Sequence, residues 1–424
     1  MIEKIEVAYG RGSVPLHADH KMAEWSVLRP EFEAAVTDPR QGFFDAIGEP
    51  LGAKPLTDLV RPGDRVVIAT SDGTRPVPNR QLMPWLLDAL KIPESQVTIL
   101  VGTGTHRPNT DAELAEMFGE DVVKRVKIVN HNAFDAAGNE HIGETASGTP
   151  VVLNKIYLKA DFRIAVGFIE PHFFAGFSGG PKAVAPGLAG IDTILRLHRA
   201  KLIGDPRSTW GILADNPLHS EIREAVALCP PDFLVNVTLN SEKKISAYYV
   251  GDYRKAHEKG CYNVKASAMV AVDRPFPVVV TSNSGYPLDQ NLYQTVKGLS
   301  AAARIVSDGG DIFVASECSD GVPDHGNFAS LMREGQSPED VIQSVYDKEP
   351  ILDQWQAQVL GTILKRARVK VFTSMDADRV RACKMSVVEN LDEAVQCRVR
   401  ALGAGTRVAV LPDGPLTIPY IKGE

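Results

Sequence analysis

The sequence predicts an α/β fold made of two doubly wound, mostly parallel-sheet domains, with the active site in the cleft between them. Three observations predict this class. The chain has 424 residues, a length typical of two domains. From about residue 65 onward, short runs of β-strand character alternate with helix-like runs. The strand-like runs are continuously apolar, which is typical of parallel strands covered on both faces.

Each predicted element follows from that alternation. In the first half we expect strands at Arg65–Ser71, Gln96–Gly102, Arg125–His131 and Phe162–Ile169, with helices at Asn79–Lys91 and Asp111–Gly119. The pattern restarts with strands at Pro277–Ser284, Asp311–Glu317, Arg368–Thr373 and Arg407–Leu411, and a helix at Asn291–Val306.

The domain boundary is expected near residue 270, because two prolines in Ala271–Pro277 interrupt the pattern there. We therefore assign residues 1–270 to an N-terminal domain and residues 271–407 to a C-terminal domain. The last segment, residues 408–424, is expected to pack back on the N-terminal domain.

Composition narrows the class of function. A formal net charge of −7 and a pI near 5.9 argue against a nucleic-acid-binding surface and favour action on small molecules. Five scattered cysteines form no CxxC pair, so neither a disulfide framework nor a thiolate zinc site is expected. The N-terminus lacks the apolar core of a signal peptide, and no run has the length of a membrane span. We expect a cytoplasmic protein without nucleic-acid or membrane partners.

The segment Gly167–Gly190, GFIEPHFFAGFSGGPKAVAPGLAG, is the most informative part of the chain. It connects a predicted strand to a helix-like run that begins near Ile191. Glycines let a backbone approach a ligand closely, and a long ordered loop in a compact fold is usually functional. The segment carries His172 and Lys182. A lysine in such a loop is either a phosphate anchor or a covalent attachment point.

Two further loops follow predicted strands: DGTRP at residues 72–76 and TGTHRP at residues 103–108. Ligands of open α/β sheets bind beyond the carboxyl ends of the strands, so the three loops converge on one crevice if their strands are neighbours. Taken singly, each loop is also typical of an ordinary turn, and each histidine is also typical of a surface or capping residue. Thr-Gly-Thr is followed by no Walker lysine. Taken together, the three loops favour function.

The side chains in these loops suit proton chemistry on a small acid. Imidazole titrates near pH 6.5, so one of His106 and His172 can act as a base while the other acts as an acid. A racemase needs a base on each side of a prochiral centre. Arg75 and a lysine from the second domain would clamp a carboxylate.

His198 lies sixteen residues after Lys182 in a helix-like run. It is either a partly buried helical histidine or a ligand for a soft metal, since imidazole suits nickel, copper or zinc. No second ligand lies at the usual i+3 or i+4 spacing. A metal there would take most of its ligands from an organic cofactor.

Together these residues resemble the nickel-pincer-nucleotide-dependent lactate racemase family of 2-hydroxyacid racemases and epimerases. The motifs that carry the resemblance span essentially the whole chain: DGTRP at 72–76, GTGTHRP at 102–108, PHFFAGFSGGPK at 171–182, YQTVK at 293–297, DQWQAQ at 353–358 and PDGPLTIPY at 412–420.

The resemblance implies a cofactor and a set of site residues. The cofactor is a nickel(II) pyridinium-3,5-bisthiocarboxylic acid mononucleotide, made by separate biosynthesis proteins, with Lys182 attached through a thioamide and His198 as the nickel ligand. The family pattern makes the first domain the cofactor-binding one, with Asp72, Gly73, Thr74 and Arg75 lining the nucleotide, His106 and His172 as acid/base pair, and Gln294, Lys297 and Arg75 binding substrate.

Gln294 and Lys297 lie three residues apart in a predicted helix and so share one face, which is otherwise typical of an exposed polar surface. Trp355 fits a pocket wall and the core equally well.

The implied reaction is inversion of C2 of a 2-hydroxy acid by proton-coupled hydride transfer to the cofactor. The bulky, apolar stretch Phe173–Phe177 favours a substrate with an apolar side chain, and lactate is the first candidate. The alternative is a carrier that holds the metal nucleotide without racemase activity, although a carrier needs neither His106 nor His172. A nucleotide-dependent α/β enzyme of another kind is disfavoured because no GxGxxG or Walker motif follows a predicted strand.

Overall fold

The chain folds into two units, which we name N-terminal and C-terminal after their largest segments. The computed structural model describes residues 2–323, 326–346 and 348–423. The N-terminal unit consists of Phe32–His198 and Arg207–Ser267, and the C-terminal unit of Met1–Glu31, Arg199–Pro206 and Ala268–Glu424.

This division has a boundary near residue 270, but it differs from the expected one at other points of the chain. Residues 1–31 and 199–206 belong to the C-terminal unit. The final segment, residues 408–424, also belongs there: β19 (Thr406–Leu411) pairs with β15 (Phe276–Ser282), and β20 (Ile418–Ile421) pairs with β14 (Met269–Val272). These ladders satisfy the backbone N–H and C=O groups of the segment within its own unit.

A mixed sheet forms the centre of the N-terminal unit. Within the described residues it has six strands in the order β13-β12-β9-β4-β5-β6, and only β12 and β13 run antiparallel. The strands of this sheet are β4 (Val66–Ser71), β5 (Val97–Gly102), β6 (Lys127–Asn130), β9 (Phe162–Phe168), β12 (Phe233–Leu239) and β13 (Ile245–Gly251). Nearly every residue of β4 and β9 is buried, as their continuous apolar pattern predicts.

Helices and two small hairpins complete this unit. α3 buries Leu82, Leu86 and Leu90 in the core next to the sheet, an apolar stripe at helical spacing. The helices are α1 (Pro39–Gly48), α2 (Leu56–Leu59), α3 (Asn79–Leu90), α4 (Asp111–Phe118), α5 (Glu120–Arg125), α6 (Lys155–Leu158), α7 (Ile191–Leu197), α9 (Pro217–Ala227) and α10 (Tyr253–Ala268), with 3₁₀ turns η1 (Glu94–Gln96) and η2 (Gly180–Ala183). The hairpins are β7 (Asn139–Glu144) with β8 (Pro150–Asn154), and β10 (Pro171–His172) with β11 (Gly176–Phe177).

The C-terminal unit contains a second sheet, which is parallel throughout. Within the described residues its order is β18-β17-β16-β15-β19-β3. Its remaining strands are β3 (Ala23–Val27), β16 (Val306–Ala315), β17 (Arg368–Phe372) and β18 (Ser386–Val387). Its helices are α8 (Ala200–Ile203), α11 (Leu292–Ala303), α12 (Phe328–Glu334), α13 (Pro338–Tyr346), α14 (Gln354–Arg366), α15 (Ala377–Ala382) and α16 (Leu391–Leu402), with the 3₁₀ turn η3 (Gly414–Leu416).

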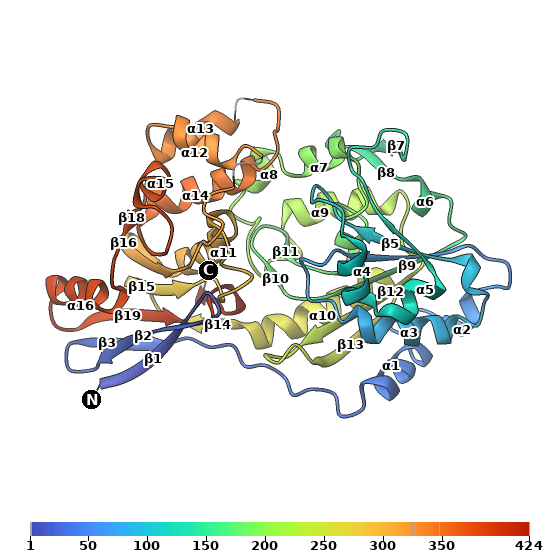
Figure 1. Cartoon of the computed structure of the whole chain (residues 1–424), viewed down its shortest axis with the longest axis horizontal. Helices are drawn as coiled ribbons and strands as arrows, with labels where there is room; N and C mark the ends of the chain where they lie inside the picture. The colour runs from blue at the N-terminus through green and yellow to red at the C-terminus, as the bar shows by residue number, and fades with distance from the viewer. Residues whose placement is uncertain (1, 324–325, 347, 424) are drawn as a thin grey trace. The chain divides into compact units, whose positions relative to one another are not determined.

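The N-terminal end of the chain supplies a strand to this second sheet. After the hairpin of β1 (Ile2–Tyr9) and β2 (Gly12–Asp19), β3 pairs with β19 (Thr406–Leu411) in parallel register. Figure 1 shows this as blue strands beside red ones in the C-terminal unit. The sequence predicts no element before residue 65, because these strands alternate between buried and exposed residues instead of forming a continuous apolar run.

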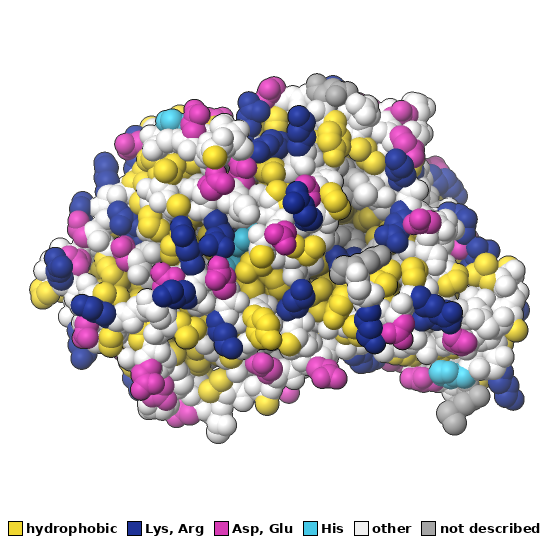
Figure 2. Space-filling view, turned by 180° about the vertical axis from the view of Figure 1, so that it is seen from behind, with side chains coloured by type: hydrophobic (Ala, Val, Ile, Leu, Met, Phe, Trp, Pro, Cys, Tyr) yellow, Lys and Arg dark blue, Asp and Glu magenta, His cyan; other side chains and the backbone are white. Residues whose placement is uncertain are grey.

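The predicted fold class is confirmed: the chain is α/β, with parallel strands and covering helices in both units. β16 begins five residues earlier than expected, since the polar stretch 307–310 interrupts the pairing between Val306 and Asp311 without ending the strand. Among the described residues, no helix is both long and apolar enough to cross a membrane. On the face in Figure 2, basic and acidic side chains are interspersed.

Candidate active site

The three loops singled out by their sequences all follow neighbouring strands. β9, β4 and β5 lie side by side and run parallel, so the loops that begin at Ile169, Asp72 and Thr103 leave the same edge of the sheet. The chain proceeds from β4 to β5 on one side and returns to β9 on the other. This point, where the strand order reverses, is where open α/β sheets bind ligands.

The loop after β4 is organised by Asp72, which is buried. Its Oδ1 accepts hydrogen bonds from the hydroxyl and the N–H of Thr74, at 2.6 and 3.3 Å. Its Oδ2 lies 2.7 Å from Nδ1 of His106, in the loop after β5. Burial alone would raise the pKa of the Asp72 carboxyl. The hydrogen bonds from His106 and Thr74 outweigh that effect, so the pKa lies below its ordinary value and the group is a carboxylate at neutral pH.

Arg75 and Gly73 also lie in this first loop. The Arg75 guanidinium lies 3.7 Å from the carboxylate of Glu170, which follows β9, so the first and third loops approach each other. A Cβ at Gly73 would lie 3.0 Å from the amide nitrogen of Asn109, so glycine lets the loop pass close to its neighbour.

The second and third loops are joined through their backbones. The N–H of Gly104 donates to the carbonyl of Gly187 at 3.2 Å. A Cβ at Gly102 would lie 3.1 Å from the same residue's backbone, so only glycine allows this approach. The Thr103 hydroxyl donates to the carbonyl of His131 and fixes the start of the second loop. The three loops therefore form one connected structure.

His172 lies on the short β10–β11 hairpin within the third loop. Its side chain is buried, and its Nδ1 accepts hydrogen bonds from the backbone N–H groups of Phe174 and Ala175, at 3.4 and 3.2 Å. The Phe174 ring packs edge-on against His172 and against His198, with centroids 4.6 and 5.5 Å away. One phenylalanine thus joins the predicted catalytic histidine to the predicted metal ligand.

Lys182 lies on the η2 turn, whose backbone is contacted by two buried side chains. Oδ1 of Asn236, in β12, accepts from the N–H of Gly180 at 2.7 Å. The ring of His257, in α10, lies against the same glycine, and its Nε2 bonds the carbonyl of Ser178 at 2.9 Å. These contacts fix the backbone that presents Lys182.

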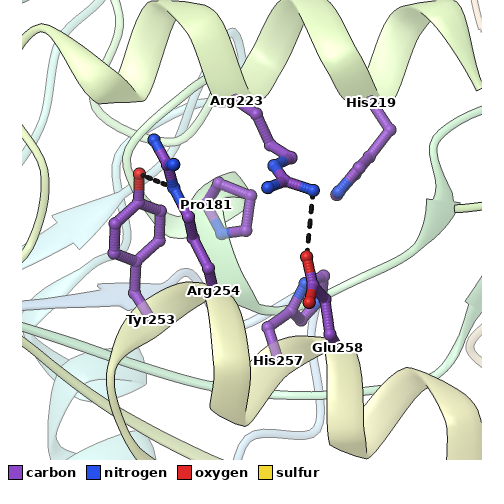
Figure 3. Close-up of a pocket in the computed structure, with 7 residues that line it drawn as sticks. All are labelled: Pro181, His219, Arg223, Tyr253, Arg254, His257 and Glu258. Carbon is purple, nitrogen blue, oxygen red and sulfur yellow. Dashed lines mark hydrogen bonds and ion pairs between the residues drawn. The ribbon is translucent and has the colours of Figure 1, made fainter. Parts of the chain in front are cut away.

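A small pocket lies behind this turn, next to Pro181 (Figure 3). α9 contributes His219 and Arg223, and α10 contributes Tyr253, Arg254, His257 and Glu258. Burial, followed by nearby positive charge, lowers the pKa of His257 to about 4. The ring is therefore neutral at pH 7. Because it is neutral, its stacking on the ring of His219 causes no charge repulsion.

His198 is buried at the C-terminal end of α7, and its Nδ1 lies 2.8 Å from the carbonyl oxygen of Ile194. A carbonyl only accepts, so Nδ1 carries the proton and Nε2 the lone pair. Burial lowers the pKa of His198 to about 4, and the charge of Lys182 adds to this effect. A neutral imidazole oriented by a carbonyl is the usual form of a metal-binding histidine.

Among the described residues, no three His, Cys, Asp or Glu side chains come together as a set of metal ligands. Lys182 and His198 both lie in the N-terminal unit, within electrostatic reach of each other. A loop lysine and a neutral, carbonyl-oriented imidazole fit a cofactor that brings its own metal ligands.

Gln294 and Lys297 lie in the C-terminal unit, in the first turns of α11. Asn291 caps this helix by accepting from the N–H of Gln294 at 3.0 Å. Nζ of Lys297 donates to the Gln294 side chain at 2.7 Å, so the two residues share a face as their spacing predicts. Trp355 is buried, and its Nε1 donates to the hydroxyl of Tyr293 at 3.0 Å.

Comparison with known protein families shows the family of this chain. Residues 9–211 match the model of the lactate racemase N-terminal domain, and residues 272–418 match that of the C-terminal domain. The chain belongs to the lactate racemase family. Two relatives named lactate racemase are similar over 87% of this chain and 88% of their own lengths: one from Thermoanaerobacterium thermosaccharolyticum (40% identical) and one from Lactiplantibacillus plantarum (38%).

Solved structures show the same fold. The lactate racemase apoprotein from Thermoanaerobacterium thermosaccharolyticum aligns with a TM-score of 0.91 and 36% identity, covering 98% of this chain and all of that one. A protein from Thermotoga maritima aligns with a TM-score of 0.68 and 19% identity over 92% of this chain and all of that one, which shows a shared fold.

The residues that hold the third loop of this lactate racemase family member are not among those that the sequence predicts. Asn236 had a usable signal, because a polar residue interrupts the apolar run FLVNVTL and a buried amide needs a partner. His257 had none, since it lies among polar residues in the long helix α10. Glu170 follows a strand directly, but nothing in the sequence pairs it with Arg75.

Proposed function

We propose that this chain is a lactate racemase that inverts C2 of lactate with the help of a nickel-pincer nucleotide attached to Lys182. The observation that supports this most is the joining of three loops at one edge of the sheet in a lactate racemase family member. These loops carry His106, His172 and Lys182, and His198 follows them in the same N-terminal unit. A carrier protein needs an attachment point and a metal ligand, but it has no use for a histidine oriented by a buried carboxylate.

Lys182 would hold the cofactor covalently, and Nε2 of His198 would bind its nickel. The tautomer set by the Ile194 carbonyl supports the second assignment. When bound, this cofactor supplies a hydride acceptor and donor. Asp72, Gly73, Thr74 and Arg75 would line its nucleotide, as the family pattern implies.

The protein's own residues supply proton transfer, substrate binding and exclusion of water. His106 and His172 act as the acid/base pair that takes the hydroxyl proton from lactate and returns it. Arg75 binds the substrate carboxylate, and we assign Gln294 and Lys297 to substrate binding on the family pattern. Phe173 and Phe174, both buried, keep the surroundings of His172 apolar and dry. The protein would act in the cytoplasm and receive its cofactor from biosynthesis proteins.

Activity on a panel of 2-hydroxy acids tests the proposed substrate. Protein co-produced with the cofactor-making proteins should convert either enantiomer of lactate to an equal mixture, measured by chiral chromatography. Malate and gluconate should react more than about tenfold more slowly, since the apolar loop offers their polar tails no partner. Turnover of malate or gluconate without turnover of lactate would refute the assignment.

The same assay separates a racemase from a carrier. His106→Ala and His172→Ala should each lower kcat by roughly 10²- to 10⁴-fold, as loss of a general acid or base does. Both variants should keep the added mass on Lys182. His141→Ala, an exposed histidine of β7, is the matched control and should retain full activity. Unchanged activity of the His106 and His172 variants would contradict the paired-histidine chemistry.

A further inference from the structure

His106 has only one arrangement of its ring proton that fits its partner. Nδ1 lies 2.7 Å from Oδ2 of Asp72. Because the Asp72 side chain is a carboxylate, it only accepts, and Nδ1 must carry the proton. The lone pair of the neutral ring therefore lies on Nε2. The imidazole is half-exposed while Asp72 is buried, so the carboxylate orients the ring from inside the protein.

His172 has the opposite arrangement. Backbone N–H groups can only donate, and those of Phe174 and Ala175 both point at Nδ1. Nδ1 therefore carries the lone pair, and the proton of the neutral ring lies on Nε2. A proton on Nδ1 would place three N–H groups against one another in a buried position.

We infer that the two histidines rest in opposite tautomers, so that Nε2 of His106 is a proton acceptor and Nε2–H of His172 is a hydrogen-bond donor. Asp72 is the positioning residue for His106, and the backbone at Phe174 and Ala175 positions His172. The tautomers stand on this geometry alone, whereas the roles rest on the proposed function. A neutral imidazole held as a donor can polarise a substrate oxygen while a second group takes the proton.

This asymmetry has a consequence for the acid/base pair. His106 can accept the hydroxyl proton of lactate at once, and the imidazolium so formed is stabilised by Asp72. His172 can accept a proton on Nε2 only after the proton already there has moved. That shift requires Nδ1 to lose its bonds to Phe174 and Ala175, so the β10–β11 hairpin must rearrange whenever His172 takes its turn as the base.

Nuclear magnetic resonance of cofactor-free protein tests the tautomers directly. Long-range ¹H–¹⁵N spectra of the imidazole rings distinguish Nδ1–H from Nε2–H. His198 and His257 serve as internal standards, because each bonds a carbonyl, through Nδ1 and Nε2 respectively. His106 should match His198, and His172 should match His257. A shared tautomer, or Nδ1–H on His172, would overturn the inference.

Asp72→Asn tests the positioning role. The amide side chain introduced by this substitution can both donate and accept, so His106 should show a mixture of tautomers while the tautomer of His172 is unchanged. Asp58→Asn, at an exposed position, is the control and should alter the spectrum of neither histidine. In loaded protein Asp72→Asn should lower kcat by roughly 10²-fold or more, with KM changed far less, as happens when a catalytic histidine loses its orienting carboxylate.

The two parts of the experiment fail separately. Unaltered His106 tautomer and kcat in Asp72→Asn would remove Asp72 from the positioning role. Opposite tautomers in a loaded protein that does not racemise lactate would refute the proposed function, and the catalytic roles assigned to the two rings would fall with it. A kcat loss without a tautomer change would also overturn the positioning role, because the loss would then have another cause.

Discussion

Asp311, in β16, is a buried carboxylate surrounded by three cations. Arg368, on the neighbouring strand β17, binds both of its oxygens at 3.0 and 2.8 Å, and Arg398 and Lys370 lie 2.6 and 3.1 Å away. Burial alone would raise the pKa of Asp311, but the hydrogen bonds from these cations lower it to about 2. Each cation is partly exposed and so keeps some contact with water.

Asp311→Asn should lower the free energy of unfolding by about 2–3 kcal/mol, because three positive charges would lose their common partner. The loss is smaller than for a pair buried on both sides, since the cations still reach solvent. Denaturant unfolding of both proteins measures it. Asp308→Asn is the matched control: this carboxylate pairs with Arg366 but is 90% exposed, so its removal should cost under about 1 kcal/mol.

The pH dependence of this difference follows from the direction of the shift. The folded-state pKa of about 2 lies below the ordinary value of 3.8, so the stabilisation is complete above about pH 4. It should disappear as the pH falls toward 2 and the carboxyl takes up a proton. Asp311→Asn should therefore approach the stability of the original protein at low pH. A constant difference from pH 7 to pH 2 would contradict the ion cluster.

At the residue scale, the sequence predicted which side chains are chemically active but not what orients them. His106, His172, Lys182 and His198 stand in glycine-rich loops or at informative spacing. Asp72 was expected only to line a nucleotide. Its bond to His106, 34 positions away, depends on β4 and β5 being adjacent, and local sequence does not encode that pairing.

The turn that presents Lys182 depends on the absence of a side chain at Gly180. This residue has a φ of +53°, and a Cβ there would lie 2.4 Å from the ring of His257. Both the backbone and the packing therefore require glycine. The turn is held by side chains from β12 and α10, elements that follow it in the sequence by more than fifty residues.

Gly180→Ala should destabilise the protein by about 2–4 kcal/mol, the sum of a left-handed backbone and an overpacked ring. It should also lower the fraction of chains with added mass on Lys182. Gly148→Ala is the control, because its φ is +78° but no atom lies within 4 Å of the new Cβ. That variant should cost only about 1 kcal/mol and load normally. Equal losses in both variants would show that contact with His257 does not matter.

At the element scale, most of the continuous apolar runs were predicted, but alternating runs were not, and neither was β12, whose apolar run is interrupted by Asn236. β4, β5 and β9 lie within two residues of their expected bounds. The strands β1 and β2 escaped prediction because one face of the hairpin is exposed and charged. The β10–β11 hairpin is too short to show any periodicity, and it exists because the loop folds back on itself at Gly176.

At the scale of the whole molecule, the chain passes between its two units at four points, after residues 31, 198, 206 and 267. His198 is the last residue before the short segment 199–206, which belongs to the C-terminal unit. In this segment, the carbonyl of Ala200 accepts a hydrogen bond from the Gln358 side chain at 2.9 Å. Two prolines in Ala271–Pro277 predicted a boundary near residue 270. Nothing in the sequence indicated the other three crossings. The one after residue 31 depends on the pairing of β3 with β19, which joins strands almost four hundred residues apart.

The central claim is that a nickel-bearing nucleotide on Lys182 enables this chain to racemise lactate. Intact-mass and nickel analysis, combined with chiral assay of lactate, test it in one preparation of the chain and of Lys182→Arg, each co-produced with the cofactor-making proteins. The chain should carry nickel and an adduct that peptide mapping places on Lys182, and it should bring L- or D-lactate to an equal mixture. Lys182→Arg should remain folded, lack the adduct and leave either enantiomer unchanged. Racemisation by Lys182→Arg at the rate of the unaltered chain, with no adduct on either, would contradict the account.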